Sequence, residues 1–243
     1  MSTATSASSS SVLLVGGGIG GLAAALALAR LGLQVELLEQ SATIGEIGAG
    51  LQLGPNAFAA LDALGVGEAV RSKAVFTERL VMMDAVDCSE VASVEVGEEF
   101  RERFRNPYAV SHRADLHGAI FEAVQQNPLI RFHTSAAVEQ LEIGDDGVVA
   151  TTRDGRSFRA QAVVGCDGVK SVVRAQLLGD APRVSGHVVY RAVVPAEQMP
   201  ADLRWNAPVV WAGPNCHLVH YPLRGGEQYN LVVTFHSREP EEW

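Results

Sequence analysis

The pattern of hydrophobic positions begins with an unbroken apolar run at residues 12–15, which is followed by a cluster of glycines and then by LAAALALARLG. A short run of Val and Leu is typical of a buried strand, and the Ala- and Leu-rich segment favours a helix that ends at Gly32. Residues 34–38 form a second apolar run and predict another strand. This order of elements predicts a βαβ unit.

Two further helices are predicted from capping residues and apolar spacing. The segment GEIGAGLQLGPN at 45–56 has too many glycines for a regular helix, and Asn56 is expected to cap a short helix that ends at Gly65. Asp115 is expected to cap a third helix. The apolar residues at helical spacing are Phe58, Leu61 and Leu64 in the first of these helices, and Leu116, Ile120, Phe121 and Val124 in the second.

The pattern changes to strands after residue 130. Asp146-Gly147 and Asp154-Gly155 predict hairpin turns, and AVVGCDG at 162–168 predicts a strand that leads into the helix SVVRAQLLG. After residue 182, four apolar segments separated by GPN and RGGEQ turns predict a second sheet.

The glycines after the first strand match the spacing GxGxxG at Gly16, Gly18 and Gly21. The first glycine permits a tight turn, the second lets the backbone approach a pyrophosphate, and the third lets the helix pack closely on the strand. The helix N-terminus offers unpaired N–H groups and partial positive charge to phosphates. Glu39 follows Gly18 by 21 residues, where a carboxylate can bind both hydroxyls of an adenosine ribose. The pattern predicts a dinucleotide site without distinguishing FAD from NAD.

Composition narrows the classes of partner. Nineteen Lys and Arg residues against 28 Asp and Glu give a formal net charge of −9, which disfavours nucleic acid and anionic membranes as partners. Cys88, Cys166 and Cys216 match neither a metal-binding spacing nor a disulfide framework, so we expect a cytoplasmic protein with reduced thiols and no metal. Residues 1–10 are expected to be a disordered tail, and no segment is long enough to span a bilayer.

Four further segments occur in an order typical of one enzyme family: GEIGAGLQLGPN at 45–56, HRADLH at 112–117, GCDGVKSVVR at 165–174 and CHLVHYPLRGG at 216–226. Together with VGGGIGG, they resemble the class A FAD-dependent aromatic monooxygenases, and in particular the 3-hydroxybenzoate 6-monooxygenase and salicylate hydroxylase-like family. The resemblance covers the chain after the N-terminal tail.

The resemblance implies an α/β fold with two domains. A Rossmann-like FAD-binding domain with an inserted β-meander, discontinuous in the family, is expected over residues 11–182, and residues 183–243 are expected to begin a mixed β-sheet substrate domain. In this family a second flavin motif, similar to GDAAHP, follows the substrate sheet, and Trp243 precedes any such motif. We therefore expect the N-terminal portion of a longer enzyme, which by itself binds FAD weakly or lacks turnover.

Bound FAD is the cofactor that the resemblance implies. The residues expected to bind it are Gly16, Gly18, Ile19, Gly20, Gly21, Glu39, Gln40, Ala49, Gly50, Arg113, Val138, Asp167 and Gly168. From the residues alone, three alternatives stay open: a surface role for Arg113, core packing for Val138, and a helix-capping turn at Asp167 and Gly168.

The candidate catalytic residues are His217, Gln52 and Tyr221. In the strand that begins at Cys216, alternation places His217 and Tyr221 on one face and His220 on the other. The resemblance selects His217 as the group that accepts or polarises the proton of the substrate phenol. A sheet histidine bonded to a neighbouring carbonyl is the alternative, and Tyr221 also fits simple packing. Similar 6-hydroxynicotinate enzymes carry His in place of Gln52, so a pyridine substrate is disfavoured.

The implied reaction uses NADH as a transient co-substrate that reduces FAD, after which dioxygen forms a flavin hydroperoxide that hydroxylates a small aromatic acid. The expected conversion is 3-hydroxybenzoate to 2,5-dihydroxybenzoate (gentisate), with salicylate as the alternative substrate. An NAD-dependent dehydrogenase and a non-catalytic flavin-binding module are the rival interpretations, and a homodimer is left open.

Overall fold

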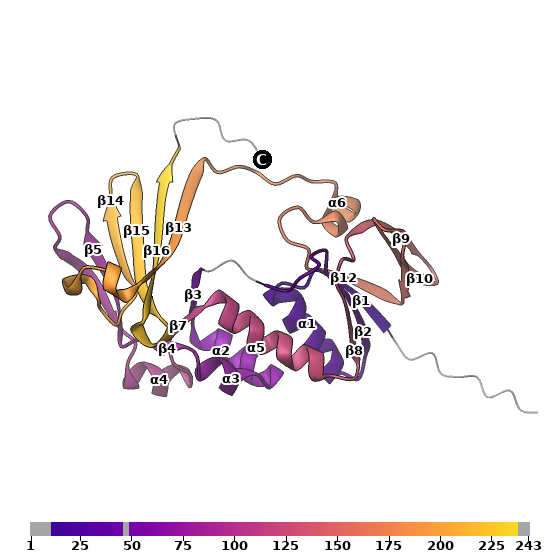
Figure 1. Cartoon of the computed structure of the whole chain (residues 1–243), viewed down its shortest axis with the longest axis horizontal. Helices are drawn as coiled ribbons and strands as arrows, with labels where there is room; N and C mark the ends of the chain where they lie inside the picture. Colours follow the sequence, from indigo (N-terminus) through magenta and orange to yellow (C-terminus); the bar gives the residue numbers. More distant parts are fainter. Residues whose placement is uncertain (1–10, 46–48, 238–243) are drawn as a thin grey trace, which may run out of the picture. The chain divides into compact units, whose positions relative to one another are not determined.

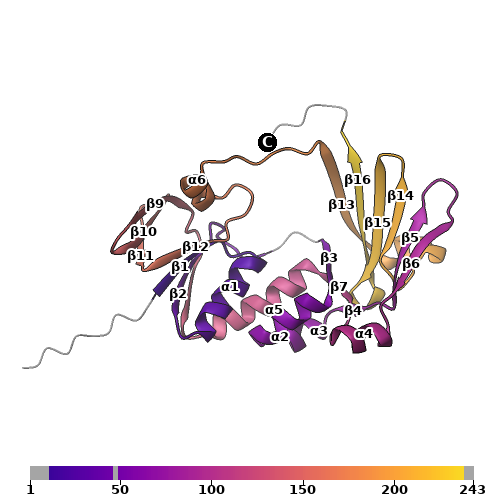
Figure 2. The ribbon, with the colours of Figure 1, turned by 180° about the vertical axis from the view of Figure 1, so that it is seen from behind.

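Two compact units make up the computed structural model, which describes residues 11–45 and 49–237 (Figure 1, Figure 2). Unit 1 comprises residues 1–45 and 120–182, and unit 2 comprises residues 46–119 and 183–243. The predicted tail at 1–10 and residues 46–48 of the glycine-rich segment lie outside the described residues. This division groups residues 46–119 with the residues after 183, because strands of the two segments pair, whereas the expected FAD-binding domain covered residues 11–182.

Unit 1 is built on a parallel sheet with the strand order β12-β1-β2-β8. These strands are β1 (Ser11–Val15), β2 (Gln34–Leu38), β8 (Ile130–His133) and β12 (Ala162–Gly165). Helix α1 (Ile19–Arg30) connects β1 to β2, packs against the sheet and buries Leu22, Ala25, Leu26 and Ala29. The parallel pairing of β1 with β2 confirms the predicted βαβ unit.

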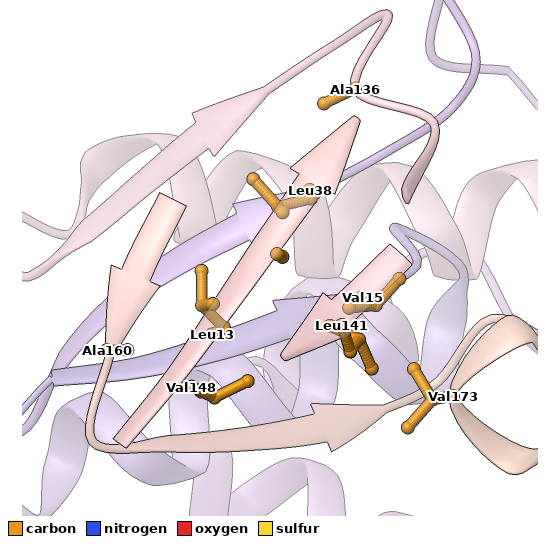
Figure 3. Packing of buried hydrophobic residues seen from close by; sticks show 9 residues of the cluster. Leu13, Val15, Leu38, Ala136, Leu141, Val148, Ala160 and Val173 are labelled. Atoms are coloured by element: carbon orange, nitrogen blue, oxygen red, sulfur yellow. The ribbon is translucent and has the colours of Figure 1, made fainter. Parts of the chain in front are cut away.

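A three-stranded antiparallel meander packs on the same sheet, opposite α1. It consists of β9 (Val138–Gly144), β10 (Gly147–Thr152) and β11 (Ser157–Ala160), joined at the two predicted Asp-Gly turns. Figure 3 shows the core between the layers, which also includes Val173 of helix α6 (Val172–Leu178). Its labelled residues are Leu13, Val15, Leu38, Ala136, Leu141, Val148, Ala160 and Val173. Because burying one such Leu or Val contributes about 1.5–3 kcal/mol, this core fixes the meander against the sheet.

Unit 2 contains a six-stranded sheet with the order β13-β16-β15-β14-β5-β6. Four strands match the predicted second sheet: β13 (His187–Pro195), β14 (Val209–Gly213), β15 (Cys216–Leu223) and β16 (Gln228–His236). The other two, β5 (Arg79–Asp84) and β6 (Glu90–Glu95), come from earlier in the chain, and β5 pairs in parallel with β14. The sequence pattern did not predict β6, since all six of its residues are exposed and it has no apolar face.

A smaller sheet and several short helices complete the described part of unit 2. The sheet has the order β3-β7-β4, with β3 (Gly50–Leu53), β4 (Val75–Phe76) and β7 (Ala109–His112). The helices are α2 (Pro55–Leu64), α3 (Gly67–Arg71), α4 (Glu98–Phe104) and the 3₁₀ turns η1 (Ala196–Gln198), η2 (Ala201–Leu203) and η3 (Arg224–Gly226). Helix α5 (Arg113–Gln126) begins in unit 2 and ends in unit 1. The α/β fold class is confirmed.

Two predicted helix caps are wrong. Helix α2 begins at Pro55 with Gly54 as its N-cap, so Asn56 lies inside the first turn. Proline suits this first position, because its missing N–H would have no helical partner there. Helix α5 begins at Arg113, which places Asp115 in the first turn. The Asp115 carboxylate instead accepts two hydrogen bonds from the Arg224 guanidinium, both 3.0 Å long.

Candidate functional site

Two glycines of the turn after β1 are required by the packing of unit 1 itself. Gly16 has φ +105°, and a Cβ added there would overlap the carbonyl oxygen of Cys166. A Cβ at Gly21 would overlap the Gly16 carbonyl oxygen and lie 3.1 Å from Leu14 Cδ2. These positions therefore have the roles predicted from the motif, a tight turn and a close contact between helix and strand.

Gly18 and Gly20 have the opposite surroundings. A Cβ added at either position would have no described atom within 4 Å, so the packing of residues 11–45 and 49–237 does not require glycine there. Gly18 is the N-cap of α1, no side chain caps this helix end, and its first turn contains no acidic residue. The turn thus combines open space with backbone donors at the positive end of a helix, the combination that binds phosphate groups.

Glu39 lies directly beside this turn. Its Oε2 accepts the N–H of Gly17 at 2.6 Å, and its Oε1 accepts the N–H of Ser41 at 2.7 Å. The backbone of Glu39 is held on both sides, because its N–H donates to His133 and its carbonyl accepts from Ala136, each at 2.8 Å. A fixed carboxylate next to a phosphate-binding turn fits the ribose of a dinucleotide, so these residues fit the adenosine diphosphate half of FAD. Gln40, the next predicted ligand, is exposed.

Asp167 accepts hydrogen bonds at the N-terminus of helix α6, whose N-cap residue is Ser171. Its carboxylate accepts hydrogen bonds from the Ser171 hydroxyl at 2.5 Å and from the N–H groups of Val172 and Val173 at 2.7 and 3.2 Å. Gly168 has φ +77°, and a Cβ there would meet no atom within 4 Å. The capping alternative therefore accounts for the carboxylate contacts of Asp167. Val138 is half-buried and packs against the unit 1 core.

In unit 2, a hydrogen bond at Gly50 links the start of β3 to the six-stranded sheet. The Gly50 N–H donates to Asn230 Oδ1 at 2.7 Å, and Asn230 is fully buried on β16. A Cβ at Gly50 would overlap the Tyr221 ring and lie 2.8 Å from Asn230 Cγ. Tyr221 and Asn230 are paired neighbours on β15 and β16. Gly50 thus places its strand directly against Tyr221.

Gln52 lies on the same short strand, and its side-chain oxygen accepts a hydrogen bond from the Tyr108 hydroxyl. Burial raises the pKa of Tyr108 and raises that of Tyr221 to about 12. Both phenols are therefore protonated donors at neutral pH. Sequence reasoning missed Tyr108, because a lone tyrosine before a short apolar strand carries no motif.

The two histidines of β15 have contrasting surroundings. His217 is exposed and shares a sheet face with Tyr221, as alternation predicts. His220 is fully buried on the other face, where its ring stacks with that of Trp211 and is tilted against that of Tyr229. Neither ring nitrogen of His220 has a hydrogen-bond partner among the described residues. Burial lowers the pKa of His220 to about 4. Of these two rings, only that of His217 is accessible to a ligand.

Arg113 begins α5 in unit 2, and its N–H donates to the carbonyl of Ala49 at 2.8 Å. The loop before β3 and the HRADLH segment are thereby joined through the backbone.

Within residues 11–45 and 49–237, no cluster of three or more His, Cys, Asp or Glu side chains could hold a metal ion. In the same residues, no helix is long and apolar enough to cross a membrane.

The chain is similar to known FAD-binding proteins. Residues 9–233 match the family model described as FAD binding domain. The chain is 61% identical over 231 residues to 3-hydroxybenzoate 6-hydroxylase of Klebsiella oxytoca and 58% identical over 232 residues to the enzyme of that name from Polaromonas naphthalenivorans. These alignments cover 95% and 96% of the chain but only 58% of each relative.

A solved structure shows the same architecture. The structure of 2,6-dihydroxypyridine-3-hydroxylase from Arthrobacter nicotinovorans matches with a TM-score of 0.79 and 27% sequence identity, over 96% of this chain and 58% of that chain. The predicted FAD cofactor and the predicted resemblance to FAD-dependent aromatic monooxygenases are confirmed by these matches. The chain belongs to the FAD binding domain family.

Proposed function

We propose that this chain is the part of an NADH-using hydroxylase that binds the adenosine half of FAD and an aromatic acid, and that the enzyme converts 3-hydroxybenzoate to 2,5-dihydroxybenzoate. The observation that carries the proposal is the open space at Gly18 and Gly20 beside the fixed Glu39 carboxylate. The substrate is suggested by the relative of 61% identity, which is named 3-hydroxybenzoate 6-hydroxylase. A cytoplasmic homodimer remains a prediction from the sequence.

The residues of unit 1 hold the nucleotide. The N–H groups at Gly18, Ile19 and Gly20 bind the diphosphate, and Glu39 accepts hydrogen bonds from the ribose hydroxyls through lone pairs that its backbone contacts leave free. Arg113 and the backbone of Val138, Asp167 and Gly168 are proposed as further ligands on the resemblance. Bound FAD supplies the transfer of electrons from NADH and the activation of dioxygen.

The residues of unit 2 prepare the aromatic ring. His217 takes the proton of the substrate phenol, which raises the electron density of the ring before oxygen transfer. Tyr221 donates a hydrogen bond from a hydroxyl that stays protonated, since its pKa is about 12. Tyr108 donates a hydrogen bond to the side-chain oxygen of Gln52, and the amide N–H groups of Gln52 are proposed to donate to the substrate.

The proposal is tested by His217→Ala in the FAD-loaded holoenzyme. We expect hydroxylation of 3-hydroxybenzoate to slow by roughly 10²- to 10⁴-fold, the usual contribution of a general base, while FAD content and the rate of flavin reduction by NADH stay near wild type. Product analysis by chromatography and stopped-flow absorbance measure these quantities. His187→Ala, at an exposed histidine on β13, is the matched control. An unchanged hydroxylation rate in His217→Ala would remove this residue from the mechanism.

A further inference from the structure

Strands β13, β14, β15 and β16 contain a single Lys or Arg residue, Arg191 on β13. The strand register shows which face of the sheet carries it. Arg191 is paired with Val232 on β16, and Val232 is paired with Val219 on β15. Paired residues of neighbouring strands point to the same face, so Arg191 lies on the face of Val219.

His217 and Tyr221 are the neighbours of Val219 on that face, one on each side along β15. Arg191 is therefore opposite the midpoint between the two proposed catalytic residues. With strands about 4.8 Å apart, its backbone lies roughly 10 Å from β15. That distance along the sheet face is comparable to the combined length of an arginine side chain and one aromatic ring. All these residues belong to unit 2.

The immediate surroundings of Arg191 are apolar. Its neighbours on the same face, Val189 and Val193 on its own strand and Val232 beside it, offer no negative charge. Arg191 is exposed, and among the described residues no carboxylate forms an ion pair with it, whereas Arg71, Arg174 and Arg224 each bind an Asp. A fixed guanidinium with free donors on a face with few charges is suited to a carboxylate ligand.

The charge of Arg191 also acts on the Tyr221 phenol. Burial raises the pKa of the Tyr221 phenol, and the positive charge of Arg191 opposes that rise. The guanidinium is therefore near enough to influence a group at the site.

We propose that Arg191 binds the carboxylate of the aromatic acid and so selects acids over neutral phenols. This inference rests on the proposed function, because it assigns one end of the same substrate. The acid would lie across β16, with its carboxylate at Arg191 and its phenol at His217. Arg191 is thus a specificity-determining residue, while proton transfer belongs to His217.

The test compares 3-hydroxybenzoate with its neutral analogue 3-hydroxybenzamide in the FAD-loaded holoenzyme. Two quantities are measured for each compound: kcat/KM, and the Kd from the change in flavin absorbance on binding. In Arg191→Gln we expect the acid to lose roughly 10- to 100-fold in both kcat/KM and affinity, because a charge-assisted pair is lost. The amide should change by less than about threefold, since it has no charge to pair. Arg191→Lys should restore part of the loss for the acid.

Arg183→Gln is the matched control, because Arg183 is exposed, precedes β13 and is outside the proposed site. It should leave both compounds unchanged. If Arg191→Gln weakens acid and amide equally, or weakens neither, the assignment of the carboxylate to Arg191 is overturned while the hydroxylase function stands. If the wild-type holoenzyme hydroxylates neither compound, the proposed function fails, and the inference fails with it.

Discussion

The glycine turn of unit 1 and the sheet face of unit 2 that carries His217 and Tyr221 are built in different ways. The turn is local: Gly16 to Gly21 and Glu39 come from one βαβ unit, and the backbone of that unit sets their positions. The sheet face carries Arg191 on β13 and His217 and Tyr221 on β15, and the separate strand β3 packs against it at Tyr221. The positions of residues in the turn depend on a few backbone angles within one segment. The positions of residues on the sheet face depend on how distant strands pair with one another, that is, on the strand register.

The largest effect is expected at Gly21, where the local site is also a packing contact. Gly21→Ala places a Cβ into the Gly16 carbonyl oxygen. We expect the free energy of unfolding to fall by about 3 kcal/mol or more, since overpacking forces the helix away from the strand. Chemical denaturation of the apoprotein measures this loss.

Gly20→Ala is the control for Gly21→Ala, because a Cβ at Gly20 would have no described atom within 4 Å. It should leave the unfolding free energy within about 1 kcal/mol of wild type. Equal destabilisation by the two substitutions would show that the distinction between packing glycines and ligand-facing glycines is wrong.

A smaller effect is expected at Asn230, which joins the two sheets of unit 2. Asn230→Ala removes the acceptor of the buried Gly50 N–H, and we expect a loss of about 1–3 kcal/mol of unfolding free energy. Thermal denaturation followed by circular dichroism gives the change. The control is Asn206→Ala, whose exposed side chain donates to the Phe76 carbonyl and should contribute less. A loss at Asn230 no greater than at Asn206 would show that the buried link does not hold β3.

The opposite face of the large sheet gives a pH-dependent prediction. The pKa of His220 in the folded chain is about 4, below the value near 6.5 of an unfolded histidine. As the pH falls from about 6.5 towards 4, the unfolded chain takes up a proton that the buried ring does not, so stability decreases. His220→Phe should weaken this decrease in melting temperature, and the exposed His187→Phe should not. Identical pH profiles for wild type and His220→Phe would contradict the burial argument.

The sequence predicted the two regions to different extents. The GxGxxG spacing, Glu39 and the alternation that separates His217 from His220 depend on short-range geometry, and the structure places all of them as expected. The contact of Gly50 with Asn230 spans 180 residues, and no local pattern encodes it. Tyr108 was missed for the same reason, because its partner Gln52 lies 56 residues away. Strand β6 escaped prediction, since none of its residues is buried.

The central claim is that the turn after β1 binds the diphosphate of FAD, and Gly18→Val tests it most directly. A Cβ at Gly18 would have no atom within 4 Å, so the apoprotein should still fold. The valine side chain would fill the space assigned to the diphosphate. Titration of the apoprotein with FAD, followed by flavin fluorescence, is predicted to show a Kd raised by about 100-fold or more, as expected when charge-assisted hydrogen bonds are lost. A Kd equal to that of wild type, in a variant with an unchanged melting temperature, would contradict the account.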